Sequence, residues 1–324
     1  MRQTRQVLPA PPATNACTDP REQCLSEAES VALCQRSWFQ TRGGPAYARK
    51  TFSDAIRSSV PGACYDLNNS DVCRYAITAY DLLGGNLSDG IPMTGGGNIR
   101  ANGRYSERPD NPQAVGPILT HRKYIYDFFV RYTGLRRNPE DYALDTEFLE
   151  KPSESGTYYA SATSDFHLEE QLTIREPWNV SADESIVFFI EGDLVLNDQY
   201  SEGQLITVEE GGFLAFLVKG NIIIRNTVGN DFVSPDTTNL TTNLEGIFIA
   251  DGTLTVESTG NPDTEKQLIA AGTYAGHQGV ILERSLESGV NTLNPAEIFI
   301  YRPDFIRYMP DWMTRPHIIW QETN

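Results

Sequence analysis

The chain has 324 residues, of which 40% are hydrophobic and 21% charged, a composition typical of a folded protein with room for more than one core. Its 43 acidic and 26 basic residues give a net charge of −17, which repels nucleic acids and anionic lipid surfaces. No apolar run approaches the length of about 20 residues that a membrane-spanning helix needs. We therefore expect neither nucleic-acid binding nor membrane insertion.

Residues 1–16 are rich in Pro and Ala, which predicts an extended N-terminal arm. This stretch lacks the apolar core of a signal peptide. Either the protein is cytosolic or the chain is a mature or excised part of a longer precursor. The cysteines favour the second interpretation.

Five cysteines lie in the first quarter of the chain, within residues 17–120, a region predicted to mix helices and loops: Cys17, Cys24, Cys34, Cys64 and Cys73. Their spacing lacks the close pairs of zinc sites, so disulfides in an extracellular protein are expected. Plausible pairs are Cys64 with Cys73, and Cys17 or Cys24 with Cys34. The odd count leaves one thiol free or linked to another chain. Reduced, buried cysteines are the alternative.

The spacing of apolar residues predicts helices over residues 19–38, 52–60 and 72–83, and the third ends at a glycine pair. Residues 84–120 contain four prolines and a glycine triplet, which predicts an irregular loop. Residues 121–155 predict a helix and a linker. In the helix, aromatic side chains lie among basic ones. An aromatic helix face that packs on the following domain is favoured over a surface that binds carbohydrate or nucleic acid. These aromatic residues are Tyr124, Phe128 and Tyr132.

Residues 156–301 repeat one sequence pattern, which consists of an apolar run, a corner with glycine and a second apolar run. Its clearest copies are IVFFIEGDLVL at 186–196, FLAFLVKGNIII at 213–224 and GIFIADGTLTV at 246–256. The runs are short and rich in Val, Ile and Phe, so they predict strands. Gly192, Gly220 and Gly252 suit sharp bends. A strand-corner-strand unit repeated every 20 to 32 residues or so predicts a stacked β-solenoid. The predicted fold is mainly β, with a smaller, partly helical N-terminal region.

Residues 213–218 are apolar at every position, so both faces of that strand must leave water. Either the helix at 121–132 or a neighbouring subunit is expected to cover the outer face. The candidate interface residues are Phe213, Phe216 and Val218, together with the three aromatic residues of the 121–132 helix. Residues 302–324 predict a cap, with a short helix, over the open end of the solenoid.

The sequence does not support a particular reaction. No G-x-S-x-G motif is present, and His121, His277 and His317 occur in unrelated contexts. A glycan-active solenoid would cluster charged residues on one exposed sheet. The candidates for such a cluster mostly follow or precede corner glycines, where a charged side chain needs no special purpose: Glu191, Asp193, Asp251, Glu245, Lys219 and Arg225. No catalytic residue, cofactor or metal ligand is predicted.

Six sequence segments resemble those of a known family: SGTYYA at 155–160, PWNVS at 177–181, ESIVFFIEGDL at 184–194, GFLAFLVKGNI at 212–222, LEGIFIADG at 244–252 and PAEIFIYRPD at 295–304. Over residues 120–322 the chain resembles the C-terminal β-solenoid region of large, mostly uncharacterised bacterial cell-surface proteins, including those of candidate-phylum lineages. The first 120 residues do not share it. The resemblance implies an exported structural or adhesive role. It assigns no catalytic residue to this chain.

The sequence thus favours a secreted surface protein that acts through contacts with itself or other surface proteins, as a filament or appendage subunit or an adhesin module. The arm, the apolar strand with two buried faces and the spare cysteine all suit self-assembly, and a head-to-tail contact would propagate a fibre. A carbohydrate-binding or carbohydrate-cleaving solenoid is the alternative. A bactofilin-like cytosolic scaffold is third, because the cysteines argue against it.

Overall fold

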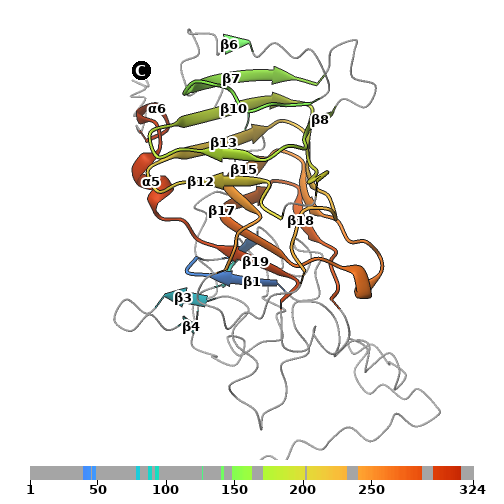
Figure 1. Ribbon diagram of the computed structural model, residues 1–324. Helices are drawn as coiled ribbons and strands as arrows, with labels where there is room; N and C mark the ends of the chain where they lie inside the picture. The colour runs from blue at the N-terminus through green and yellow to red at the C-terminus, as the bar shows by residue number, and fades with distance from the viewer. Residues whose placement is uncertain are drawn as a thin grey trace, which may run out of the picture.

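The computed structural model describes the solenoid and parts of the N-terminal region (Figure 1). The described residues are 39–44, 46–48, 78–80, 87–89, 92–94, 126, 140–141, 148–162, 171–200, 203–231, 240–286 and 295–314. The five cysteines, the 1–16 arm and the helices predicted at 19–38 and 52–60 lie outside these ranges.

The molecule is mainly β, and residues 156–300 form a β-solenoid of about four turns, which confirms the predicted fold class. One long sheet forms its first side, and all of the pairings along it are parallel. Its strands follow one another in the order β6 (Glu140–Asp141), β7 (Gly156–Ser161), β10 (Ser185–Glu191), β13 (Phe213–Val218), β15 (Leu244–Ala250), β17 (Leu268–Gly276), β19 (Glu297–Ile300) and β1 (Phe39–Arg42).

A five-stranded parallel sheet forms the second side: β8 (Gln171–Ile174), β11 (Asp193–Leu196), β14 (Ile222–Ile224), β16 (Thr253–Val256) and β18 (Gly279–Leu282). Two short strands, β9 (Trp178–Val180) and β12 (Ile206–Val208), pair with each other, and the first residue of β12 also pairs with the first residue of β15. Each turn therefore runs from the long sheet to the five-stranded sheet and back. A short 3-10 helix, η2 (Pro262–Thr264), follows β16.

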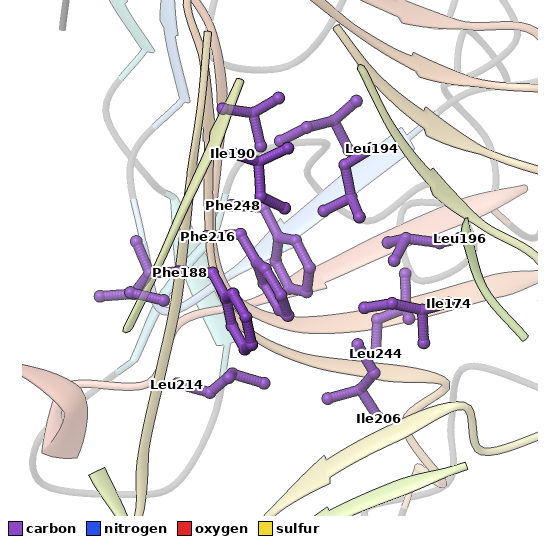
Figure 2. Packing of buried hydrophobic residues seen from close by; sticks show 14 of the residues in the cluster. Ile174, Phe188, Ile190, Leu194, Leu196, Ile206, Leu214, Phe216, Leu244 and Phe248 are labelled. Carbon is purple, nitrogen blue, oxygen red and sulfur yellow. The ribbon is translucent and has the colours of Figure 1, made fainter. Parts of the chain in front are cut away.

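An aromatic ladder fills the interior along the long sheet. The rings of Phe188, Phe216, Phe248 and Tyr274 stack on successive turns, with centroids 5.7, 5.2 and 5.1 Å apart. Figure 2 shows the three phenylalanines facing aliphatic side chains of the opposite sheet, among them Leu194, Leu196 and Ile174. Each stacked pair contributes about 0.5–1.5 kcal/mol beyond the area it buries. Stacking in register therefore aligns the turns as well as filling the core.

The corners between the two main sheets confirm the role predicted for glycine. The backbone amides of Gly220 and Gly252 donate to the carbonyls of Gly192 and Gly220, at 3.0 and 2.9 Å. A Cβ on Gly220 would lie 2.6 Å from the Gly192 carbonyl oxygen, closer than real Cβ contacts come. The turns stack too tightly at this corner for any other residue there.

Part of the outer face of the long sheet, at β10 and β13, is covered by the chain's own C-terminal segment, which forms α5 (Asp304–Tyr308) and α6 (Asp311–Thr314). The ring of Phe305 lies 6.2 Å from that of Phe213, edge to face, and Trp312 stacks on Phe189 at 6.2 Å. Tyr126, which is helical, packs edge to face on Phe189 at 5.9 Å. The expectation of two buried faces on β13 is confirmed, since all six residues are buried.

The described part of the segment predicted as a C-terminal cap, residues 302–314, does not lie over the end of the solenoid. The ring contacts above place α5 and α6 against the flat face of the sheet, not over its end. The end beyond β19 is instead extended by β1, which pairs with β19 in parallel from Phe39 opposite Glu297 to Arg42 opposite Ile300. A segment from the N-terminal region thus covers the edge that the last turn would expose.

The N-terminal region contains strands where helix and loop were predicted. Residues 78–80, inside the helix predicted at 72–83, form β3 (Thr78–Tyr80), which pairs antiparallel with β4 (Leu87–Asp89). Residues 46–48 form β2 (Ala46–Ala48), parallel to β5 (Pro92–Thr94). Strands β4 and β5 fall within the segment predicted as irregular loop. Thr78 and Tyr80 favour a strand, and pairing with the nearby β4 overrides the short helical pattern.

Candidate functional site

The corner between the two main sheets is where the structure brings charged side chains together. In the pairings that join β10, β13, β15 and β17, the last aligned residues on the four successive turns are Ile190, Val218, Ala250 and Gly276. The residue that follows each of them in the chain therefore takes the same position at the corner. Those four residues are Glu191, Lys219, Asp251 and His277, one per turn. Asp193 lies two residues beyond Glu191, at the start of β11. The corner therefore gathers four of the six charged candidates, with His277 added.

Glu191 is held by its neighbours in its ionised form. One carboxylate oxygen accepts a hydrogen bond from the ammonium group of Lys219 on the next turn, and the other accepts one from the hydroxyl of Tyr159 on the previous turn. The bond from Lys219, followed by that from Tyr159, lowers the pKa of Glu191 below its usual value. A general acid needs the opposite shift. Glu191 therefore suits a structural link between three turns.

Asp193 starts a second ladder along the same corner. Its carboxylate accepts from the backbone amide of Asn221 at 2.7 Å and from the side-chain amide at 3.1 and 3.2 Å. The side-chain oxygen of Asn221 in turn accepts from the backbone amide of Thr253 at 2.9 Å. These bonds satisfy backbone donors at the bend, where the strand ladder is interrupted.

Asp251 fastens the helical residue Tyr126 to the corner. The carboxylate of Asp251 is buried and accepts a hydrogen bond from the backbone amide of Tyr126 at 3.1 Å. His277, on the next turn, lies in a bend after β17 and is partly exposed, as expected for a polar loop residue. His121 and His317 lie outside the described residues.

Glu245 and Arg225 lie away from this corner. Glu245, on β15, accepts from the backbone amide of Val208 at 2.8 Å and pairs with Arg302 at 2.9 Å. Arg302 also holds Asp304 through two parallel hydrogen bonds, of 2.9 and 2.6 Å. These bonds lower the pKa of Asp304 below its usual value. Arg225 forms a more exposed pair with Glu257 at 2.8 Å.

Three of the predicted interface residues, Phe213, Phe216 and Val218, are buried within the chain. Phe213 is covered by Phe305, as described above. Phe216 stacks between Phe188 and Phe248 inside the solenoid, so its assignment to an interface is wrong. Val218, two residues further along the same strand, is also buried within the chain. Tyr124, Phe128 and Tyr132 lie outside the described residues.

The outer face of the five-stranded sheet is a surface that the sequence analysis did not single out. Its register aligns one outward position on each strand: Thr173, Val195, Ile223, Thr255 and Ile281. All five are β-branched and uncharged, and all except the buried Val195 are partly exposed. The alternation in TLTV at 253–256 was a signal for it, since Leu254 and Val256 are buried while Thr253 and Thr255 are not. We call these five residues the outer stripe.

Two buried ionisable residues that the sequence does not indicate, Arg284 and Glu297, lie close together. Both side chains are almost fully buried, next to the last turn of the solenoid. No local pattern indicates them, because the two residues are 13 positions apart and meet only when the last turn closes.

Within the described ranges, no three His, Cys, Asp or Glu side chains are grouped so as to hold a metal ion. Nor does that part of the chain contain a helix long and apolar enough to cross a membrane. Comparison with protein-family models, with curated proteins and with solved structures finds no match.

Proposed function

We propose that the protein is an extracellular structural protein that acts through contacts with other proteins at a cell surface. The outer stripe is the observation that carries this proposal. Four of its five side chains, all but the buried Val195, are partly exposed, and an uncharged row of β-branched side chains spaced by the stacking of strands suits contact with another protein surface. The charged side chains at the corner support it too, because Glu191 and Asp193 are engaged with neighbouring turns and link them together.

Lateral contact suits this architecture better than end-to-end stacking. Both ends of the long sheet carry strands that precede the solenoid in the chain, β6 at one end and β1 at the other. On its outer face β13 contacts α5, and all six of its residues are buried within the chain, so this strand is no longer an argument for self-assembly. An adhesin module, or a filament whose subunits meet side by side, agrees with both observations.

The test is a substitution on the outer stripe with a matched control. The double variant I223K/I281K places two charges on the outer stripe, whereas I306K places one on α5, where Ile306 is 60% exposed. Light scattering and negative-stain microscopy of the purified proteins would measure assembly. We expect wild type and I306K to form the same assemblies and the double variant to remain monomeric. Monomeric wild-type protein, or assemblies unaffected by the double substitution, would contradict lateral self-assembly.

A carbohydrate-binding or carbohydrate-cleaving role is the second candidate, and the row of ionisable side chains at the corner is the observation that favours it. Glu191, Lys219, Asp251 and His277 follow one another on four turns, and Lys219 is half exposed. A glycan array probed with wild type and with the variants K219A and H277A would decide. A glycan bound by wild type and lost in both variants would favour this role over the structural one.

A further inference from the structure

Glu297 is an acidic residue buried in the interior of the solenoid at the point where the N-terminal region joins it. It is the first residue of β19 and pairs with Leu268 of β17 on one side and with Phe39 of β1 on the other. Its side chain is fully buried. One carboxyl oxygen, Oε1, accepts a hydrogen bond from the backbone amide of Arg284 at 3.2 Å. The other, Oε2, has no hydrogen-bond partner among the described residues.

The nearby Arg284 does not neutralise Glu297 through a close ion pair. Its guanidinium donates to three backbone carbonyls, those of Glu257, Lys266 and Arg225, at 3.1, 3.0 and 3.0 Å. These contacts use each nitrogen of the planar group, which is itself buried. The arginine thus links backbone segments of successive turns, and its charge acts on Glu297 only at longer range.

The other charged groups around Glu297 do not compensate for its burial. The negative charge of Glu265 repels that of ionised Glu297. The positive charge of Arg284 is shared, because Glu265 and Glu257 attract it as well. On β17 the ionisable side chain is Tyr274, whose own pKa burial raises well above its ordinary value. On β1, Arg42 donates to Gln40 at 2.9 Å, and alternation places both on the face opposite to Phe39 and Glu297.

Burial therefore dominates the titration of this carboxyl. Desolvation raises the pKa of Glu297 to about 8, against the attraction of Arg284. The neutral acid is the form that fits the interior at neutral pH. An ionised Oε2 would lack a donor in the described surroundings, and such a charge is strongly unfavourable in a core.

We propose that Glu297 is a pH-sensitive lock, which holds β1 on the end of the solenoid while its carboxyl is neutral and loosens that joint when the carboxyl ionises. The position of Glu297 explains why the effect is local. Strand β19 connects β1 to the rest of the long sheet, so disturbing β19 disturbs the attachment of residues 39–42 first. The turns from β7 to β17 do not depend on this carboxyl for their pairing.

Hydrogen exchange of the peptide that spans residues 39–42, followed by mass spectrometry, tests the proposal. After correction for the intrinsic base-catalysed rate, protection in wild type is expected to fall between about pH 6 and about pH 8, by up to about tenfold per pH unit. In Glu297→Gln, which keeps a neutral group of the same shape, protection should be independent of pH. The control Glu184→Gln removes a carboxylate that pairs with Lys151 at the surface, and should behave like wild type.

Two results would overturn the lock. One is equal loss of protection in wild type and Glu297→Gln, and the other is unchanged protection in wild type over the whole range. If Glu297→Gln does not fold, infrared spectroscopy of the wild type decides instead. A protonated carboxyl band that is present near pH 7 and disappears by about pH 9 supports the proposal, and the absence of that band near pH 7 contradicts it.

Discussion

Arg302 Nη1 lies 2.9 Å from Glu245 Oε2, and this contact joins the C-terminal segment to the outer face of the long sheet. The same guanidinium nitrogen donates to the carbonyl of Val208 at 3.2 Å, and the group lies over the ring of Phe305 at 4.5 Å. One side chain thus connects β12, β15 and α5. The covering of the sheet by α5 and α6 depends on this arginine as much as on the aromatic contacts.

Removing Arg302 should therefore destabilise the protein. Arg302→Ala removes the cation that pairs with Glu245, in a site where the two side chains are only 18% and 14% exposed. We expect a loss of about 3 kcal/mol in the free energy of unfolding. Urea denaturation measures it. Arg225→Ala is the control, because its pair with Glu257 is 39% and 27% exposed and should contribute less than about 1 kcal/mol. Equal losses in the two variants would refute the role assigned to Arg302.

The aromatic ladder predicts a large effect at Phe216. Truncation by Phe216→Ala leaves a cavity between Phe188 and Phe248, and should cost about 3–5 kcal/mol. Phe216→Leu fills most of that space and should cost less than half as much. Tyr200→Ala is the control, since Tyr200 is 56% exposed and its loss should change stability by about 0.5 kcal/mol or less. Thermal unfolding of the three variants would rank them, and a small effect of Phe216→Ala would argue against the stacked core.

The sequence predicted the solenoid because its signals are local and repeated. The three clearest repeats, at 186–196, 213–224 and 246–256, each contain two runs rich in β-branched and other apolar residues and a corner glycine, and the steric crowding at Gly220 requires that glycine. The direction of side chains in β13 could not be predicted, since an entirely apolar strand has no alternation to show which positions face inward. The expectation that Phe216 belongs to an interface fails for that reason.

Contacts between distant segments left no local signal. The pairing of β1 with β19 joins residues more than 250 positions apart, and β1 completes a sheet built by the other end of the chain. The corner row of Glu191, Lys219 and Asp251 was partly foreseeable, because each of the three lies next to a corner glycine in a repeated phrase. Arg284 and Glu297 were not, since their role depends on burial that only the closed last turn creates.

The corner glycines should not tolerate even a small side chain. Gly220→Ala brings a Cβ to 2.6 Å from the carbonyl oxygen of Gly192 and to 2.1 Å from a carboxylate oxygen of Asp193. We expect a loss of at least about 2 kcal/mol, because the backbone of two turns must separate. Gly260→Ala is the comparison. Gly260 has a φ of 74° but nothing within 4 Å of an added Cβ, so only the backbone strain, about 1 kcal/mol, should appear. A milder effect at Gly220 than at Gly260 would contradict the close stacking of the corners.

Acid should release α5 from the sheet before the solenoid unfolds. The hydrogen bonds from Arg302 lower the pKa of Asp304 below its ordinary value of 3.8, so the ionised form is favoured in the folded state. This contribution to stability is present above the unfolded pKa and is lost as the pH falls through the lower, folded pKa. Hydrogen exchange of residues 304–308 should therefore increase below about pH 4, while that of β13 and β15 stays slow. In Asp304→Asn the same peptide should exchange faster at neutral pH and lose most of its acid dependence. If acid loosens α5 equally in wild type and Asp304→Asn, then a group other than Asp304 must control the attachment.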